Sequence, residues 1–247
     1  MTSFASLIQL LAAATVGAAV FVGIATRANL RGRPRAVGVF LLGALITLPN
    51  VIEAAVFHIA PPGAIAWLFS IAVVTQALVA WTVENFLEGG ESGLAPGPLL
   101  MGASPVWWIG RLLLLGVAYL VIYFMAGATI YPFVREFYAT KQLPPTSTVA
   151  LLQLMVRGPM FAIVGACVVF LLRRSRRASA LGAGMVLAGI GGVMSLLAPN
   201  SLFPDAVRIV HLAEVTISNF AFGVLVGWML WRPLEQTGGG LMPPERA

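Results

Sequence analysis

The segment 207–220, VRIVHLAEVTISNF, carries side chains capable of chemistry inside a strongly apolar part of the chain. Four of them follow one another at spacings of three, three and four residues, on one face of a helix: Arg208, His211, Glu214 and Ser218. A histidine beside a carboxylate can relay a proton, ligate a metal or contact a polar ligand. Because an ionised side chain in lipid costs about 2.5–3.5 kcal/mol, we expect this face to meet polar partners or a cavity.

Two other apolar segments carry polar groups at a matching depth. Segment 36–59 holds Asn50, Glu53 and His58, and segment 148–172 holds Arg157. At 1.5 Å per helical residue, Glu53, Arg157 and Glu214 each lie about 9–14 Å from the same membrane edge. We therefore predict one buried polar cluster in which Arg157 lies between two carboxylates. Its members are Asn50, Glu53, His58, Arg157, His211 and Glu214.

The types of these residues leave the chemistry open. His58, His211 and Glu214 are zinc-type ligands, and a zinc-bound water would cleave a lipid-borne ester or amide. A haem held by the two histidines is a related alternative, so neither catalytic residues nor a cofactor can be assigned. Retinal is excluded because the only lysine, Lys141, falls in a predicted loop and cannot form a Schiff base within a span.

Glu84 and Arg111 form a second candidate pair near the other membrane edge. Each lies close to the end of its apolar segment, where the two side chains could meet. We expect a structural ion pair here, with extension of Arg111 toward lipid headgroups as the alternative.

The elements that must position these residues are seven membrane-spanning helices. The chain has 247 residues, 59% of them hydrophobic and 10% charged, whereas soluble domains are about one-quarter charged. A span needs about 20 apolar residues. The predicted spans are 4–26, 36–59, 64–86, 106–130, 148–172, 178–198 and 207–231. Residues 1–231 are thus expected to form one all-helical domain, with 87–105 as the longest loop and 232–247 as a disordered polar tail.

Arginine distribution predicts the orientation of this bundle. With seven spans, ten arginines of the loops 27–35 and 173–177 and of the tail fall on one side, and only Arg135, Lys141 and Arg208 fall on the other. The positive-inside rule places the first side in the cytoplasm and the N-terminus outside, most simply in a bacterial cytoplasmic membrane. The same pattern explains the net charge of +6 without nucleic acid as a partner.

Three functions remain open on these grounds. The short loops fit an accessory or scaffold subunit of a membrane complex, with membrane lipids and other membrane subunits as partners. Titratable groups beside Pro49 and Pro159 fit a proton- or ion-coupled small-molecule carrier. The histidines and Glu214 fit a metal-dependent intramembrane hydrolase. We expect the subunit role first, since it requires nothing of the polar cluster beyond helix packing.

Overall fold

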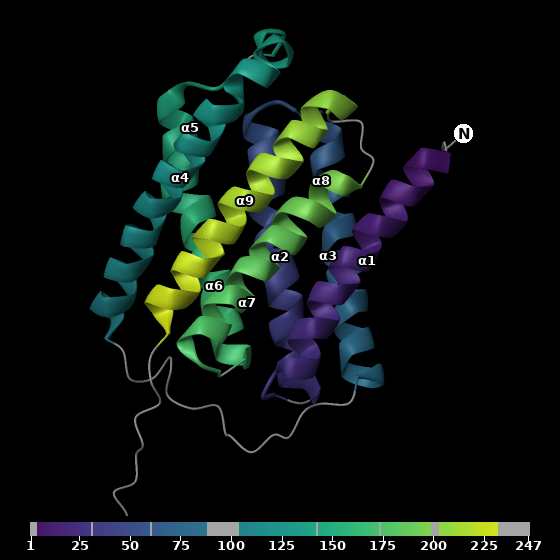
Figure 1. Ribbon diagram of the computed structural model, residues 1–247, viewed down its shortest axis with the longest axis vertical. Coiled ribbons are helices and arrows are strands. Elements are labelled where there is room, and N and C mark those ends of the chain that lie inside the picture. The colour runs from purple at the N-terminus through teal and green to yellow at the C-terminus, as the bar shows by residue number, and fades with distance from the viewer. Residues whose placement is uncertain are drawn as a thin grey trace, which may run out of the picture.

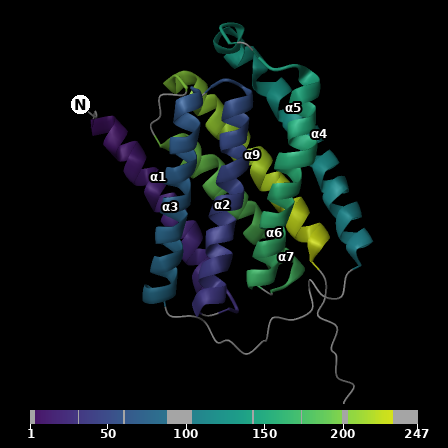
Figure 2. The same ribbon diagram turned by 180° about the vertical axis from the view of Figure 1, so that it is seen from behind.

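The architecture was obtained as a computed structural model that describes residues 4–30, 32–59, 61–87, 104–141, 143–172, 174–198 and 203–231. Every regular element in these ranges is a helix (Figures 1 and 2). Seven helical segments are long and apolar enough to cross a membrane. The predicted all-helical, seven-span fold is therefore confirmed, and the chain is an integral membrane protein. The predicted tail 232–247 and most of the predicted loop, residues 88–103, lie outside the described residues.

Five of the spans are continuous helices, and two are interrupted by a π-helical turn. The continuous spans are α1 (Phe4–Arg27), α2 (Gly32–Val56), α3 (Pro62–Phe86), α4 (Pro105–Ala139) and α9 (Asp205–Leu230). The fifth span consists of α5 (Thr146–Leu152), η1 (Gln153–Arg157) and α6 (Gly158–Leu172). The sixth consists of α7 (Arg176–Ala188), η2 (Gly189–Met194) and α8 (Ser195–Leu197).

Two helix ends differ from the predicted boundaries in ways that affect the site. Helix α4 continues to Ala139 instead of ending at residue 130, because the charged residues Arg135 and Glu136 end the apolar run without ending the helix. Helix α2 stops at Val56 instead of residue 59. The turn that follows contains His58 with a positive φ of 52°, a left-handed conformation typical of helix C-termini.

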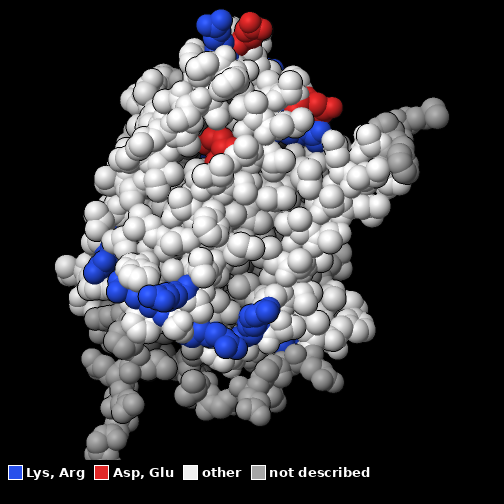
Figure 3. Space-filling view, in the orientation of Figure 1, with Lys and Arg blue, Asp and Glu red and all other residues white. Residues whose placement is uncertain are grey.

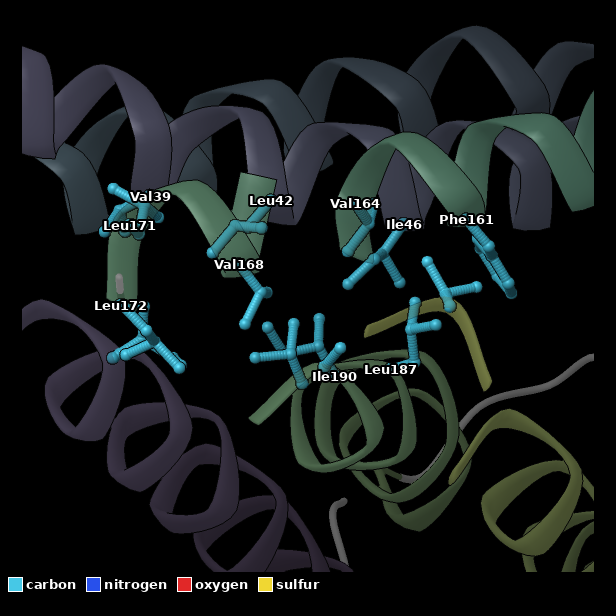
Figure 4. Close-up of a cluster of buried hydrophobic side chains, with 14 of the residues drawn as sticks. Val39, Leu42, Ile46, Phe161, Val164, Val168, Leu171, Leu172, Leu187 and Ile190 are labelled. Atoms are coloured by element: carbon cyan, nitrogen blue, oxygen red, sulfur yellow. The ribbon is translucent and has the colours of Figure 1, made fainter. Parts of the chain in front are cut away.

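Helix α6 lies at the centre of the bundle, packed against α2, α4, α7 and α9, and α1 and α4 lie on opposite flanks (Figures 1 and 2). Figure 4 shows the core where α6 meets α2 and the sixth span. Its buried side chains include Val39, Leu42, Ile46, Phe161, Val164, Val168, Leu187 and Ile190. Lipid tails are as apolar as these residues, so the contacts stabilise the bundle mainly through close packing.

Small residues allow the closest helix pairs. Where α9 crosses α7, a Cβ atom at Gly223 would lie 2.6 Å from the Ala183 carbonyl oxygen. One turn further along, a Cβ atom at Gly227 would lie 2.6 Å from the Ala180 Cα atom. Only glycine permits this approach, as in the small-residue motifs of membrane helices.

Arginines gather at one end of the bundle, which we call the arginine end (Figure 3). Arg27 lies in the last turn of α1, and Arg176 begins α7. Arg35 is buried there, and its Nη2 atom donates to the carbonyl oxygens of Val83 at 2.9 Å and Leu87 at 2.5 Å. These acceptors are the last carbonyls of α3, so Arg35 of α2 caps a neighbouring helix.

Candidate functional site

The carboxylate of Glu53 joins α2 to the fifth span. Its Oε2 atom pairs with Nη1 of Arg157, and its Oε1 atom accepts a hydrogen bond from Nε2 of Gln153 at 3.0 Å. The second terminal nitrogen of Arg157 donates to Oδ1 of Asn50 at 3.0 Å. The Arg157 side chain is only 6% exposed. We call these four side chains the Glu53 network; it neutralises a buried guanidinium with charge-assisted bonds.

The local sequence explains why the fifth span widens at this network. Pro159 has no N–H to donate to the carbonyl four residues earlier, which weakens the α-helical pattern. The N–H of Gly158 instead bonds to the carbonyl of Gln153, five residues back, and so closes the π turn. Single π turns within α-helices are frequent at functional sites, and this one carries both Gln153 and Arg157.

Close packing of α4 holds Arg157 from the other side. A Cβ atom at Gly116 would lie 2.6 Å from the carbonyl oxygen of Leu154, so α4 touches the backbone of η1 directly. This approach brings the Tyr119 ring to 5.8 Å from the guanidinium, while the Phe161 ring lies at 5.3 Å. Arg157 is therefore fixed by rings as well as by Glu53.

A second hydrogen-bonded chain runs from α4 to α9. The Tyr138 hydroxyl lies 2.9 Å from Nε2 of His211, and Nδ1 of His211 lies 3.4 Å from Oε2 of Glu214. The neutral imidazole with its hydrogen on Nδ1 satisfies both contacts, because it donates to Glu214 and accepts from Tyr138. The Phe203 ring also packs on His211, with centroids 5.4 Å apart. This chain could carry a proton between the hydroxyl and the carboxylate.

Asn50, Glu53 and Arg157 of the Glu53 network line one cavity of about 520 Å³ together with Tyr138, His211 and Glu214; we call this space the polar cavity. Its walls come from α2, α4, the fifth and sixth spans and α9, in the half of the bundle away from the arginine end. Ligand sites in proteins commonly enclose about 300–1,000 Å³. The volume thus suits a small organic molecule.

Helix irregularities surround the polar cavity. Pro49 lies inside α2 next to the lining residue Asn50, and Pro132 lies inside α4 next to the lining residue Tyr131. The turns η1 and η2 contribute Arg157 and Gly191. Four of the five walls therefore carry an internal proline or a π turn where they meet the cavity.

Five of the six residues predicted for the cluster come together here, and one does not. Asn50, Glu53, Arg157, His211 and Glu214 all line the polar cavity. The expected arrangement differs in one respect, because Arg157 pairs with Glu53 while Glu214 contacts His211 instead. His58 is exposed beyond the end of α2 and is not a lining residue, since the early stop of that helix turns it away.

The predicted metal ligands do not assemble. No three histidine, cysteine, aspartate or glutamate side chains of the described ranges lie close enough to hold a metal ion. His58 lies in the turn after α2 and does not line the cavity that His211 and Glu214 line. His211 itself is already engaged by Tyr138 and Glu214.

The predicted pair of Glu84 and Arg111 does not form either. Glu84 lies 3.6 Å from Arg33, and the Arg111 guanidinium stacks over the Trp107 ring at 5.3 Å. Helices α3 and α4 lie on different sides of the bundle in both views, so their ends do not meet (Figures 1 and 2).

Tyr138 is the lining residue that the sequence reasoning missed. It lies two turns beyond the predicted end of its span, in the extension of α4. The spacing of Tyr131, Val134 and Tyr138, at i, i+3 and i+7, would have indicated a helical face continuing past the apolar run. Tyr119 and Tyr123 of α4 also line the cavity.

The site therefore combines a neutralised ion pair on one wall with a carboxylate, a histidine and a hydroxyl on another. The cavity has a volume and polar groups suited to a small organic molecule. No family model, curated protein or solved structure matches the chain, so its function has to be inferred from this geometry.

Proposed function

We propose that the protein is a proton- or ion-coupled carrier of a small molecule, with the polar cavity as its binding site. The observation that carries the proposal is the cavity itself. Charged side chains from α2, η1 and α9 line a space of about 520 Å³, with Glu53 and Arg157 paired on one wall and Glu214 beside His211 on another. Glu214 and His211 supply the titratable groups that coupling requires.

The helix irregularities beside the cavity support this proposal. Carriers commonly place substrate sites where membrane helices are discontinuous, because a break supplies backbone groups and allows one part of a helix to move against another. The π turns η1 and η2 and the internal prolines Pro49 and Pro132 adjoin this cavity.

The other two candidate functions fit the geometry less well. An accessory or scaffold subunit needs well-packed polar contacts but has no use for a cavity lined by charged groups. A metal-dependent hydrolase needs a ligand set, and no three histidine, cysteine, aspartate or glutamate side chains of the described part of the chain are grouped to form one. We place the carrier in a bacterial cytoplasmic membrane with the arginine end inside, as the arginine distribution favours.

Accessibility of the cavity from the two membrane faces tests the carrier proposal without a known substrate. Ser218 lines the cavity, and Ser218→Cys in a Cys167→Ala background places one thiol there. We expect trimethylammonium-ethyl methanethiosulfonate, a membrane-impermeant cation, to modify this thiol from outside in cells and from inside in inverted vesicles. Alternating access predicts both reactions.

A matched control uses a serine that is remote from the cavity. Ser179 on α7 is fully buried near the arginine end, so Ser179→Cys should resist modification from both faces. Reaction of Ser218→Cys from one face alone would refute a carrier in favour of a one-sided binding protein. Absence of reaction from both faces would refute the cavity as an accessible site.

A further inference from the structure

An apolar groove lies beside the polar cavity, between two helices that face the membrane. It runs between α4 and α9, which pack side by side, and its lining includes Met125, Phe133, Ile209 and Ile217. Ile209 and Ile217 are largely exposed on the lipid face of α9. We call this feature the lateral groove. Its apolar lining can contact the hydrocarbon chains of lipids as readily as the rest of the outer surface of the bundle does.

The lateral groove and the polar cavity share part of their lining. Ile122, Ile130, Glu214 and Ser218 border both spaces. Figure 3 shows one acidic patch in the white middle part of this face of the molecule, away from the charged residues at its two ends. A molecule lying between α4 and α9 would therefore place one end among apolar side chains and its other end against a carboxylate.

Glu214 is the charged group of the cavity that is least occupied by protein partners. Both oxygens of Glu53 and both terminal nitrogens of Arg157 are used within the Glu53 network. Among the described residues, Glu214 has His211 as its one hydrogen-bond partner, at 3.4 Å. The charge presented to a ligand is thus that of a carboxylate beside an imidazole, which favours a cationic head over an anionic one.

The walls around Glu214 favour the same kind of head. Aromatic side chains line the polar cavity on several sides, namely those of Phe57, Tyr119, Tyr123, Phe124, Tyr131, Tyr138 and Phe203. Ring faces attract organic cations, and cages of aromatic residues are the usual sites for ammonium groups. An anionic head would gain nothing from these rings.

We infer that the lateral groove and the polar cavity together bind a lipophilic amine, with its ammonium group at Glu214 and its hydrocarbon body between α4 and α9. The inference rests on the proposed function and names its substrate class. Entry is sideways from the bilayer, through the border formed by Ile122, Ile130 and Ser218. A membrane-dissolved amine needs no aqueous path to reach Glu214.

Protection of the Ser218→Cys thiol measures this binding directly. Dodecylamine, dodecanol and dodecanoate share one chain and differ in their heads, and ethylamine has the amine head with a short chain. In nanodiscs we expect dodecylamine to slow modification by the thiosulfonate about tenfold more than dodecanol or dodecanoate do, as an ion pair with ring contacts would give. Ethylamine should protect weakly.

Two variants separate the roles of head and chain. Glu214→Gln should reduce the protection that dodecylamine gives the thiol to that given by dodecanol. Ala213→Phe, which fills the groove from α9, should reduce the protection by dodecylamine to that given by ethylamine. Should either variant fail to fold, the comparison of the four probes on the Ser218→Cys protein alone still decides the matter.

The outcomes distinguish the two proposals. Modification of Ser218→Cys from both faces without preferential protection by dodecylamine would leave the carrier standing and refute the amine. Equal protection by the three long-chain probes would show that the groove binds hydrocarbon chains without distinguishing their head groups. This result would likewise refute the proposal that the site binds a lipophilic amine. Strong protection by ethylamine would refute the role of the lateral groove.

Discussion

Arg157 is tolerated inside the membrane because Glu53 and Asn50 occupy its two terminal nitrogens. A guanidinium stays protonated even when buried, so it cannot escape the cost of burial by losing its charge. The partner carboxylate is itself only 18% exposed, and Gln153 holds its other oxygen. The energetic weight of the Glu53 network therefore lies in keeping the charges paired, more than in the attraction that they add.

Removal of Glu53 alone should cost more stability than removal of both charges of the pair. Glu53→Gln would leave Arg157 buried and unpaired, and we expect it to lower the free energy of unfolding by about 3 kcal/mol. The double variant Glu53→Gln/Arg157→Met removes both charges. Its free energy of unfolding should lie within about 1 kcal/mol of the wild-type value. Thermal unfolding of the purified protein in detergent measures each value.

The exposed pair of Glu84 and Arg33 provides the control. Their side chains are 37% and 91% exposed, so Glu84→Gln should change stability by less than about 1 kcal/mol. Additive losses in the double variant would mean that Glu53 and Arg157 do not stabilise each other.

Among the helices, the contact of α4 with the fifth span determines the shape of the cavity. Gly116 and Gly158 face one another, and a Cβ atom at Gly158 would lie 2.9 Å from the Cα atom of Gly116. The obstacle at Gly116 is the backbone oxygen of Leu154, which cannot rotate aside as a side chain would. A larger residue must push the two helices apart.

Gly116→Ala should therefore destabilise the protein by about 1–3 kcal/mol, the usual cost of overpacking a close contact. It should also weaken binding at the cavity, because Tyr119 would move away from Arg157. Gly110→Ala in the same helix meets no atom within 4 Å and should leave stability unchanged or slightly raised. Equal effects of the two substitutions on melting temperature would show that the contact is not tight.

Hydropathy predicted the helices well, since a bilayer requires long apolar segments with satisfied backbones. It could not predict where α4 ends, because a helix may continue beyond the lipid, and so Tyr138 was overlooked. Depth along an ideal helix brought Glu53, Arg157 and Glu214 to one level but misplaced His58, which lies in a left-handed turn. Which hydrogen-bond partner a buried side chain contacts, such as His211 for Glu214, depends on how the helices pack and cannot be predicted from sequence spacing alone.

At the scale of the whole molecule, the bundle has a basic end and an end that holds the polar cavity (Figure 3). The positive-inside rule predicts that the cavity faces the outer leaflet. Single cysteines at exposed positions of each end can test this orientation.

In a Cys167→Ala background, Thr140→Cys should react with a membrane-impermeant maleimide in intact cells, because it lies at the cavity end. Arg177→Cys at the arginine end should react only after the cells are permeabilised. The reverse pattern would invert the topology and place the cavity on the cytoplasmic side.

Arg35 links the beginning of α2 to the end of α3, and the buried side chain of Gln76 on α3 occupies the space that Gly43 leaves on α2. Neither contact involves any later part of the chain. The two helices can therefore enter the bilayer as a preassembled hairpin while the ribosome is still synthesising the remainder. Glu53 of this hairpin would then lie in the lipid without its ion-pair partner until Arg157, about one hundred residues further along the chain than Glu53, has been synthesised.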